Sequence, residues 1–134
     1  MEKRKHIMLV EDEEQVRYVM SLVLEGAGYE VTMVESGDKA LELFAAGLAY
    51  GNPIYDLLIT DVRMPEMTGV ELLEHLKSLG VSIPCLAISG YANKGTVVEL
   101  MRFGCNNFID KPLSIDQLID AVKFTFDAAA TSAM

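Results

Sequence analysis

The chain has 134 residues, 51% of them hydrophobic, which is typical of one globular domain with its own core. A formal net charge of −9 argues against binding along a nucleic-acid backbone, and no apolar run is long enough to span a bilayer. The N-terminus is basic and then briefly apolar, but no cleavage site follows. We therefore expect a soluble, cytoplasmic protein that contacts neither membrane nor nucleic acid directly.

Short apolar runs alternate with amphipathic segments along the whole chain. In chain order we predict a strand over 7–10, a helix over 14–24, a strand over 30–34, a helix over 38–46, a loop over 47–55, a strand over 57–60, a helix over 69–79, a strand over 84–88, a helix over 96–103, a strand over 107–109 and a helix over 115–126. Ser36 and the Ser114–Gln117 pair are typical helix caps.

This alternation predicts an α/β fold in which five parallel strands carry helices on both faces. We expect a single domain over 1–134, with its core over about 5–127 and a frayed tail over 128–134. Cys85 and Cys105 lack metal-ligand spacing, so we expect reduced, structural thiols.

Polar residues follow all five predicted strands, and those after four of them are of types that fit together chemically. They are Glu11 and Asp12 after the first strand, Asp61 after the third, Ser89 after the fourth, and Asp110 and Lys111, followed by Pro112, after the fifth, whereas Glu35 and Ser36 follow the second. Each alone has an ordinary interpretation as a helix cap, a turn or a solvated side chain. In a flavodoxin-like strand order, 2-1-3-4-5, Glu11, Asp12 and Asp61 would instead converge at one edge of the sheet.

Three converging carboxylates repel one another unless a cation lies among them, and their oxygens suit Mg²⁺. Lys111 can reach the same edge to hold an anion, and Ser89 can donate to a phosphate oxygen. A carboxylate beside Mg²⁺, a lysine and a hydroxyl is the set that an aspartyl nucleophile for phosphoryl transfer requires.

The motifs VEDEE (10–14), DVRMPEMTG (61–69), Ser89 and DKP (110–112) together resemble the receiver domain of bacterial two-component response regulators, the CheY-like superfamily. The resemblance covers about residues 5–127. It implies a flavodoxin-like doubly wound (βα)5 fold in which Asp61 is the phosphoacceptor.

The resemblance also implies roles for the other residues. Asp12, Asp61 and the Arg63 main-chain carbonyl would bind Mg²⁺, and Glu11 would act mainly through water. Lys111 would contact the phosphoryl group, with a cis Lys111–Pro112 bond. Ser89 and Phe108 would be the switch residues. Arg63 and Tyr91, each two residues past a site residue, are candidates for tuning the lifetime of the phosphoryl group.

The sequence departs from the commonest form of the family at three positions. Glu11 stands where Asp is frequent, Ser89 where Thr is frequent, and Phe108 where Tyr is frequent. None of these changes removes the chemistry, but Phe108 offers no phenol for a hydrogen bond.

The expected partners are a sensor histidine kinase or a histidine phosphotransfer protein, and a downstream protein target or output domain. The alternatives are a receiver excised from a hybrid kinase or transcriptional regulator, an aspartyl-phosphate phosphatase, and a pseudo-receiver that acts only by binding. A phosphatase of the haloacid dehalogenase type would need an acid where Arg63 stands, so we expect no turnover of an external substrate.

Overall fold

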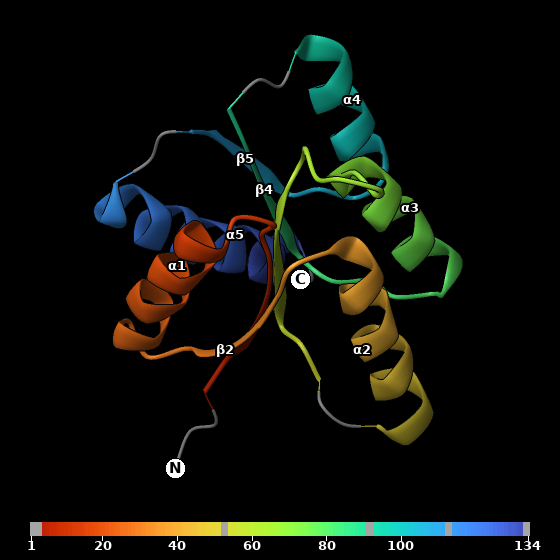
Figure 1. Cartoon of the computed structure of the whole chain (residues 1–134), viewed down its shortest axis with the longest axis horizontal. Coiled ribbons are helices and arrows are strands. Elements are labelled where there is room, and N and C mark those ends of the chain that lie inside the picture. Colours follow the sequence, from red (N-terminus) through yellow and green to blue (C-terminus); the bar gives the residue numbers. More distant parts are fainter. Residues whose placement is uncertain (1–3, 52–53, 91–92, 112–113, 133–134) are drawn as a thin grey trace.

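The computed structural model describes residues 4–51, 54–90, 93–111 and 114–132 and contains five strands that alternate with five helices (Figure 1). In chain order they are β1 (His6–Val10), α1 (Glu14–Gly26), β2 (Glu30–Val34), α2 (Gly37–Tyr50), β3 (Leu57–Asp61), α3 (Gly69–Ser78), β4 (Cys85–Ser89), α4 (Lys94–Arg102), β5 (Asn107–Asp110) and α5 (Ile115–Ser132).

All five strands are parallel and lie in the order β2-β1-β3-β4-β5, which confirms the predicted fold class. The central strand β3 is buried at every residue, as are β4 and all of β1 except His6. Strands covered on both faces need apolar side chains in both directions, and this is why they read as continuous apolar runs in the sequence.

The helices form two layers, one on each face of the sheet. Figure 1 shows α1 and α5 on one side and α2, α3 and α4 on the other. Alternate residues of each strand enter different cores: Met8 and Leu58 pack beneath α2, α3 and α4, whereas Leu9 and Ile59 pack beneath α1 and α5.

The predicted caps are present. Ser36 Oγ accepts a 3.2 Å hydrogen bond from the Lys39 N–H at the start of α2. Ser114 and Gln117 exchange side-chain to backbone hydrogen bonds of 3.1 and 2.7 Å before α5. These contacts satisfy N–H groups that have no partner inside the helix.

Two element ends differ from the prediction. Helix α2 continues to Tyr50, because Gly47 is tolerated inside it and the first stop is Gly51, with φ 75°. The predicted loop over 47–55 is therefore wrong for its first four residues, and residues 52–53 lie outside the described part. Helix α5 continues through the predicted frayed tail as far as Ser132, since alanine favours helix.

The remaining boundaries agree with the prediction to within two residues, with β2 matching at both ends, and β3 and β4 include Asp61 and Ser89 as their last residues. In the described part of the chain, none of the helices combines the length and apolar character needed to cross a membrane.

Candidate functional site

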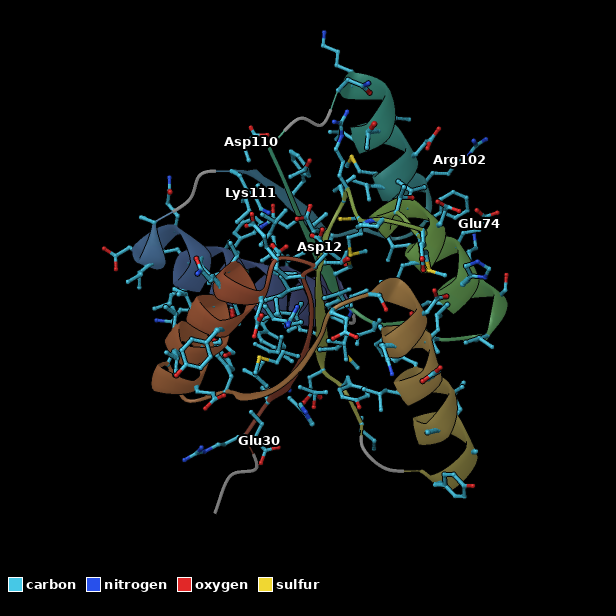
Figure 2. The ribbon with its side chains drawn as sticks, viewed as in Figure 1. Asp12, Glu30, Glu74, Arg102, Asp110 and Lys111 are labelled. Carbon is cyan, nitrogen blue, oxygen red and sulfur yellow. The ribbon has the colours of Figure 1, made fainter. Side chains whose placement is uncertain are left out.

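The polar residues singled out from the sequence lie at the carboxyl edge of the sheet. Asp61 and Ser89 end β3 and β4, and Glu11 directly follows β1. In Figure 2 the side chains of Asp12 and Lys111 lie toward this edge, whereas Glu30, at the start of β2, lies at the opposite end of the sheet. The parallel topology therefore brings together groups from four strands.

Glu11 is fixed although it lies in a loop. Its side chain is buried, and its Oε2 accepts a 3.1 Å hydrogen bond from the Glu13 N–H. Its own N–H donates to Val34 O at 3.1 Å, and Arg17 Nη1 donates to Glu11 O at 2.9 Å. The guanidinium of Arg17 thus holds the backbone of this loop, a role that sequence reasoning missed.

Asp61 is 8% exposed and is held by two hydrogen bonds. The Arg63 N–H donates to Asp61 Oδ1 at 3.2 Å, and Lys111 Nζ donates to Asp61 Oδ2 at 2.7 Å. Because one bond comes from the backbone of the next turn, the carboxylate orientation is set by local structure and by a distant strand together.

Lys111 joins the first acid to the third strand. The side-chain Nζ of Lys111 lies 3.0 Å from Glu11 Oε1 and 2.7 Å from Asp61 Oδ2. The backbone N–H of Lys111 donates to Ser89 O at 2.9 Å. Burial on its own lowers the pKa of this ammonium, but the hydrogen bonds to Asp61 and Glu11 outweigh burial and raise the pKa of Lys111. Lys111 therefore stays positively charged at neutral pH.

The acid pair and Asp61 form a cluster of carboxylates. One carboxylate oxygen from each of Glu11, Asp12 and Asp61 lies within 4.8 Å of the others, with Asp12 exposed to solvent. Burial raises the pKa of Glu11, the nearby charge of Asp61 adds to the rise, and hydrogen bonds from Glu13 N–H and Lys111 oppose it. Hard oxygen donors with one side open to water fit a Mg²⁺ ion, which keeps several waters when it binds.

The two switch candidates lie on neighbouring strands, Ser89 at the end of β4 and Phe108 within β5. Ser89 is 1% exposed and lines a cavity of about 530 Å³ together with Thr68 of the β3–α3 turn and Thr96 of α4. Phe108 is half-buried and packs against the core beneath α2, α3 and α4, beside Ala87 in the β4–β5 register. Both residues therefore lie where a shift of α4 would change their surroundings.

The turn after Asp61 is tight. The Gly69 N–H donates to Val62 O at 2.8 Å, and a Cβ at Gly69 would lie 2.8 Å from Asp61 O. Glu66 within this turn has φ 69°, in the left-handed region. Gly69 is thus needed for the close approach of α3 to the end of β3, a more specific role than starting a helix.

The other expected residues are placed as follows. The Arg63 side chain is exposed to solvent. Tyr91 and Pro112 lie outside the described residues, so the lifetime role of Tyr91 and the cis Lys111–Pro112 bond stay predictions.

Comparison with known proteins gives a consistent result. A family model described as the response regulator receiver domain matches residues 7–123. The transcriptional regulatory protein FixJ of Rhizobium meliloti (strain 1021) is 37% identical over 117 residues, which are 87% of this chain and 54% of FixJ. The transcriptional regulatory protein ZraR of Escherichia coli (strain K12) is 34% identical over 112 residues, 84% of this chain and 24% of ZraR.

Solved structures show the same likeness. The crystal structure of FixJ-N has a TM-score of 0.77 at 33% identity, covering 94% of this chain and 96% of that one. The receiver domain protein (CheY-like) of Methanospirillum hungatei JF-1 has a TM-score of 0.84 at 26% identity, covering 97% and 99%. The chain spans about half the length of FixJ and about a quarter of the length of ZraR.

Proposed function

Because this chain belongs to the response regulator receiver domain family of two-component systems, we propose that it accepts a phosphoryl group from a phosphohistidine onto Asp61. The observation that carries the proposal is the placement of Asp61, held at the end of β3 between Lys111 and the acid pair. The family is one of signalling domains, and we propose a cytoplasmic location with it.

The residues around Asp61 have complementary parts in this reaction. An Asp61 carboxylate oxygen forms the new bond to phosphorus, while the bond to the donor imidazole nitrogen breaks and its electron pair stays on the imidazole. Lys111, already 2.7 Å from Asp61, is placed to pair with a phosphoryl oxygen. The Arg63 N–H keeps the other carboxylate oxygen oriented.

Glu11, Asp12, Asp61 and the Arg63 main-chain carbonyl are the groups that would hold Mg²⁺, with Glu11 acting through water. When bound, the ion neutralises charge that gathers on the phosphoryl oxygens. The raised pKa of Glu11 supports this assignment, because a buried carboxylate that is difficult to ionise gains from a nearby cation.

Recognition of the phosphodonor fits the face that α1 and α5 share. Val19, Leu22 and Ile115 are more than half exposed there. A cavity of about 500 Å³ on this face is lined by Val19, Ile115 and also Lys111, so it reaches the reactive edge. A histidine kinase or histidine phosphotransfer protein that covers this apolar surface would bring its phosphohistidine to Asp61.

The phosphorylated state is read on the face formed by α4, β5 and α5. Ser89 would donate to a phosphoryl oxygen, Phe108 would follow, and the surface of α4 would change, where Val98 and Met101 are exposed. The target is a downstream protein or an output domain, since relatives such as FixJ are named as transcriptional regulators and are longer than this chain.

The lifetime of the aspartyl phosphate is part of the proposal. Arg63 and Tyr91 would shield the phosphoryl group from water. Phosphate loss should be faster in the Arg63→Ala, Tyr91→Ala double variant than in the wild type, and equal rates in the two proteins would contradict the shielding role.

We expect no turnover of an external substrate, because Arg63 stands where a phosphatase of the haloacid dehalogenase type would require a second acid.

The test is labelling with acetyl phosphate and Mg²⁺, followed by intact mass spectrometry. The wild type should gain one phosphoryl group and the Asp61→Asn variant none. Asp110→Asn is the matched control, since Asp110 ends β5 but is exposed, and it should be labelled like the wild type. Full labelling of Asp61→Asn would refute the proposed function. Chemical-shift changes with beryllofluoride and Mg²⁺ in the wild type would separate a working receiver from a pseudo-receiver.

A further inference from the structure

Two buried cysteines lie side by side at the opposite end of the sheet from the phosphoacceptor. Cys85 begins β4, and Cys105 precedes β5, directly after Gly104. Cys105 Sγ lies 3.7 Å from Cys85 O, although the residues are 20 positions apart in the chain, and it donates to Asn107 O at 3.0 Å. Sequence spacing alone did not pair them.

The backbones that carry these thiols are held together firmly. The Asn106 N–H donates to Cys85 O at 3.0 Å, and the Cys85 N–H donates to Asn106 Oδ1 at 2.9 Å. Strands β4 and β5 are register neighbours from Leu86 and Asn107 onward, and paired strands lie about 5 Å apart. The register extended back by one residue places Cys85 level with Asn106, so Cys105 lies diagonally from Cys85, and a disulfide between them would have to bridge Cα atoms about 4.4–6.8 Å apart.

The two thiols differ in reactivity. The hydrogen bond to Cys105 and complete burial raise the pKa of Cys85 well above its usual value. The interaction with the Cys85 side chain lowers the pKa of Cys105, and interactions with the backbone of Asn107 and Ala87 add to this against the effect of burial. Since Cys105 is also the more exposed of the two, it is the thiol that an oxidant would meet first.

A small oxidant can approach Cys105. Cys105 is 8% exposed, whereas Cys85 is fully covered. A cavity of about 360 Å³ between the ends of α3 and α4 is lined by Phe103 and Gly104, the two residues that precede Cys105. This space admits a molecule of the size of hydrogen peroxide as far as Gly104, the residue directly before Cys105 in the chain.

We propose that Cys85 and Cys105 are an oxidisable dithiol that a hydroperoxide converts into an intramolecular disulfide. The Cys105 thiolate attacks a peroxide oxygen, the O–O bond breaks, and the departing hydroxide takes a proton, which leaves Cys105 as a sulfenic acid and releases water. The Cys85 sulfur then attacks Cys105 sulfur, and the departing hydroxide takes the Cys85 proton to form a second water. The two thiols thereby lose two electrons to the peroxide.

The disulfide would close a loop that contains the proposed switch residue Ser89 and the helix α4. It would tie the start of β4 to the entry of β5, so that Ser89 and all of α4 lie within the closed loop. The inference does not use the proposed phosphorylation, and it holds or fails independently of that function.

The test uses the full chain, reduced and then freed of reductant. After exposure to hydrogen peroxide the protein is denatured, alkylated with N-ethylmaleimide and weighed. The expected product is a monomer lighter by two hydrogen atoms that takes no alkylating agent, takes two equivalents after reduction, and yields a Cys85–Cys105 peptide pair. Two free thiols after exposure, a sulfinic acid on Cys105, or a bond formed only between chains would each overturn the proposal.

Single variants assign the two roles. In Cys85→Ala, Cys105 should form a sulfenic acid that dimedone traps. In Cys105→Ala, the remaining Cys85 should react at least roughly tenfold more slowly, because it is covered and protonated. Equal rates would overturn the assignment. Circular dichroism checks that each variant folds. If Cys85→Ala does not fold, Cys85→Val replaces it, and if Cys105→Ala does not fold, Cys105→Ser replaces it.

Discussion

The ammonium of Lys111 donates a 2.7 Å hydrogen bond to Asp61 Oδ2, so the proposed nucleophile is paired with a cation before any phosphodonor arrives. The same ammonium lies 3.0 Å from Glu11 Oε1. Lys111 thereby offsets the repulsion between two nearly buried carboxylates, and this contact leads to the first prediction.

Replacing Lys111 with Met should destabilise the metal-free protein at neutral pH by about 1–3 kcal/mol, because Glu11 and Asp61 lose a charged hydrogen-bond donor. Urea denaturation in EDTA measures this change. Lys123→Met is the control, since Lys123 is exposed on α5 and should change stability little. An equal effect of the two variants would contradict the bridging role of Lys111.

Glu11 should make stability depend on pH. Burial raises the pKa of Glu11 above its ordinary 4.5, so the folded state holds this proton more tightly than the unfolded state. The corresponding stability is fully present below about pH 4.5 and is lost as pH rises through the raised pKa. Glu11→Gln should therefore have a higher Tm than the wild type at neutral pH in EDTA, and the difference should vanish on acidification. A lower Tm for Glu11→Gln at neutral pH would show that the ionised carboxylate stabilises the fold.

Mg²⁺ should stabilise the protein through the carboxylate cluster, because a ligand that binds only the folded state raises its stability. Asp12→Asn should weaken Mg²⁺ binding by roughly tenfold or more, since even groups that only support a metal ligand cost about 10–100-fold when removed. Thermal unfolding at increasing Mg²⁺ concentration gives the affinity. Glu13→Gln removes the same charge one residue later, outside the cluster, and should retain wild-type affinity.

Gly69→Ala should displace the end of β3. The new Cβ would lie 2.8 Å from Asp61 O and 3.1 Å from the Val62 Cα, and neither backbone atom can move alone. We expect a loss of about 1–3 kcal/mol in unfolding free energy together with slower labelling by acetyl phosphate. Gly26→Ala is the control, because a Cβ there meets nothing within 4 Å. If Gly69→Ala left both quantities unchanged, the close approach would have no role in positioning Asp61.

The sequence allowed the layout of the site to be predicted because each apolar run ends on a polar residue. Asp61 and Ser89 lie at neighbouring strand ends as expected, since the parallel order could be inferred from strand–helix alternation and motif resemblance. What could not be predicted depends on tertiary contact. The bond from Arg17 to Glu11 O joins a helix surface to a loop carbonyl, and no sequence pattern marks it.

The errors at element ends have a local cause. The loop prediction over 47–55 was based on the Gly51–Pro53 cluster, but this cluster lies four residues after Gly47, and a single glycine such as Gly47 inside a helix costs only about 1 kcal/mol. The pairing of Cys85 with Cys105 was missed for another reason, because it depends on the β4–β5 register, which periodicity alone does not specify.

The ion pair between Glu11 and Lys111 joins residues that are 100 positions apart in the chain, and this separation affects when the site is completed during synthesis and folding. During synthesis the acidic groups of the first three strands are made well before their neutralising lysine, which is positioned only when β5 pairs with β4. Contacts between distant parts of a chain also form slowly, since a long loop must close first. The reactive edge is therefore among the last features to be completed, so under the proposed function a truncated or half-folded chain would lack the lysine beside Asp61 and would not be phosphorylated.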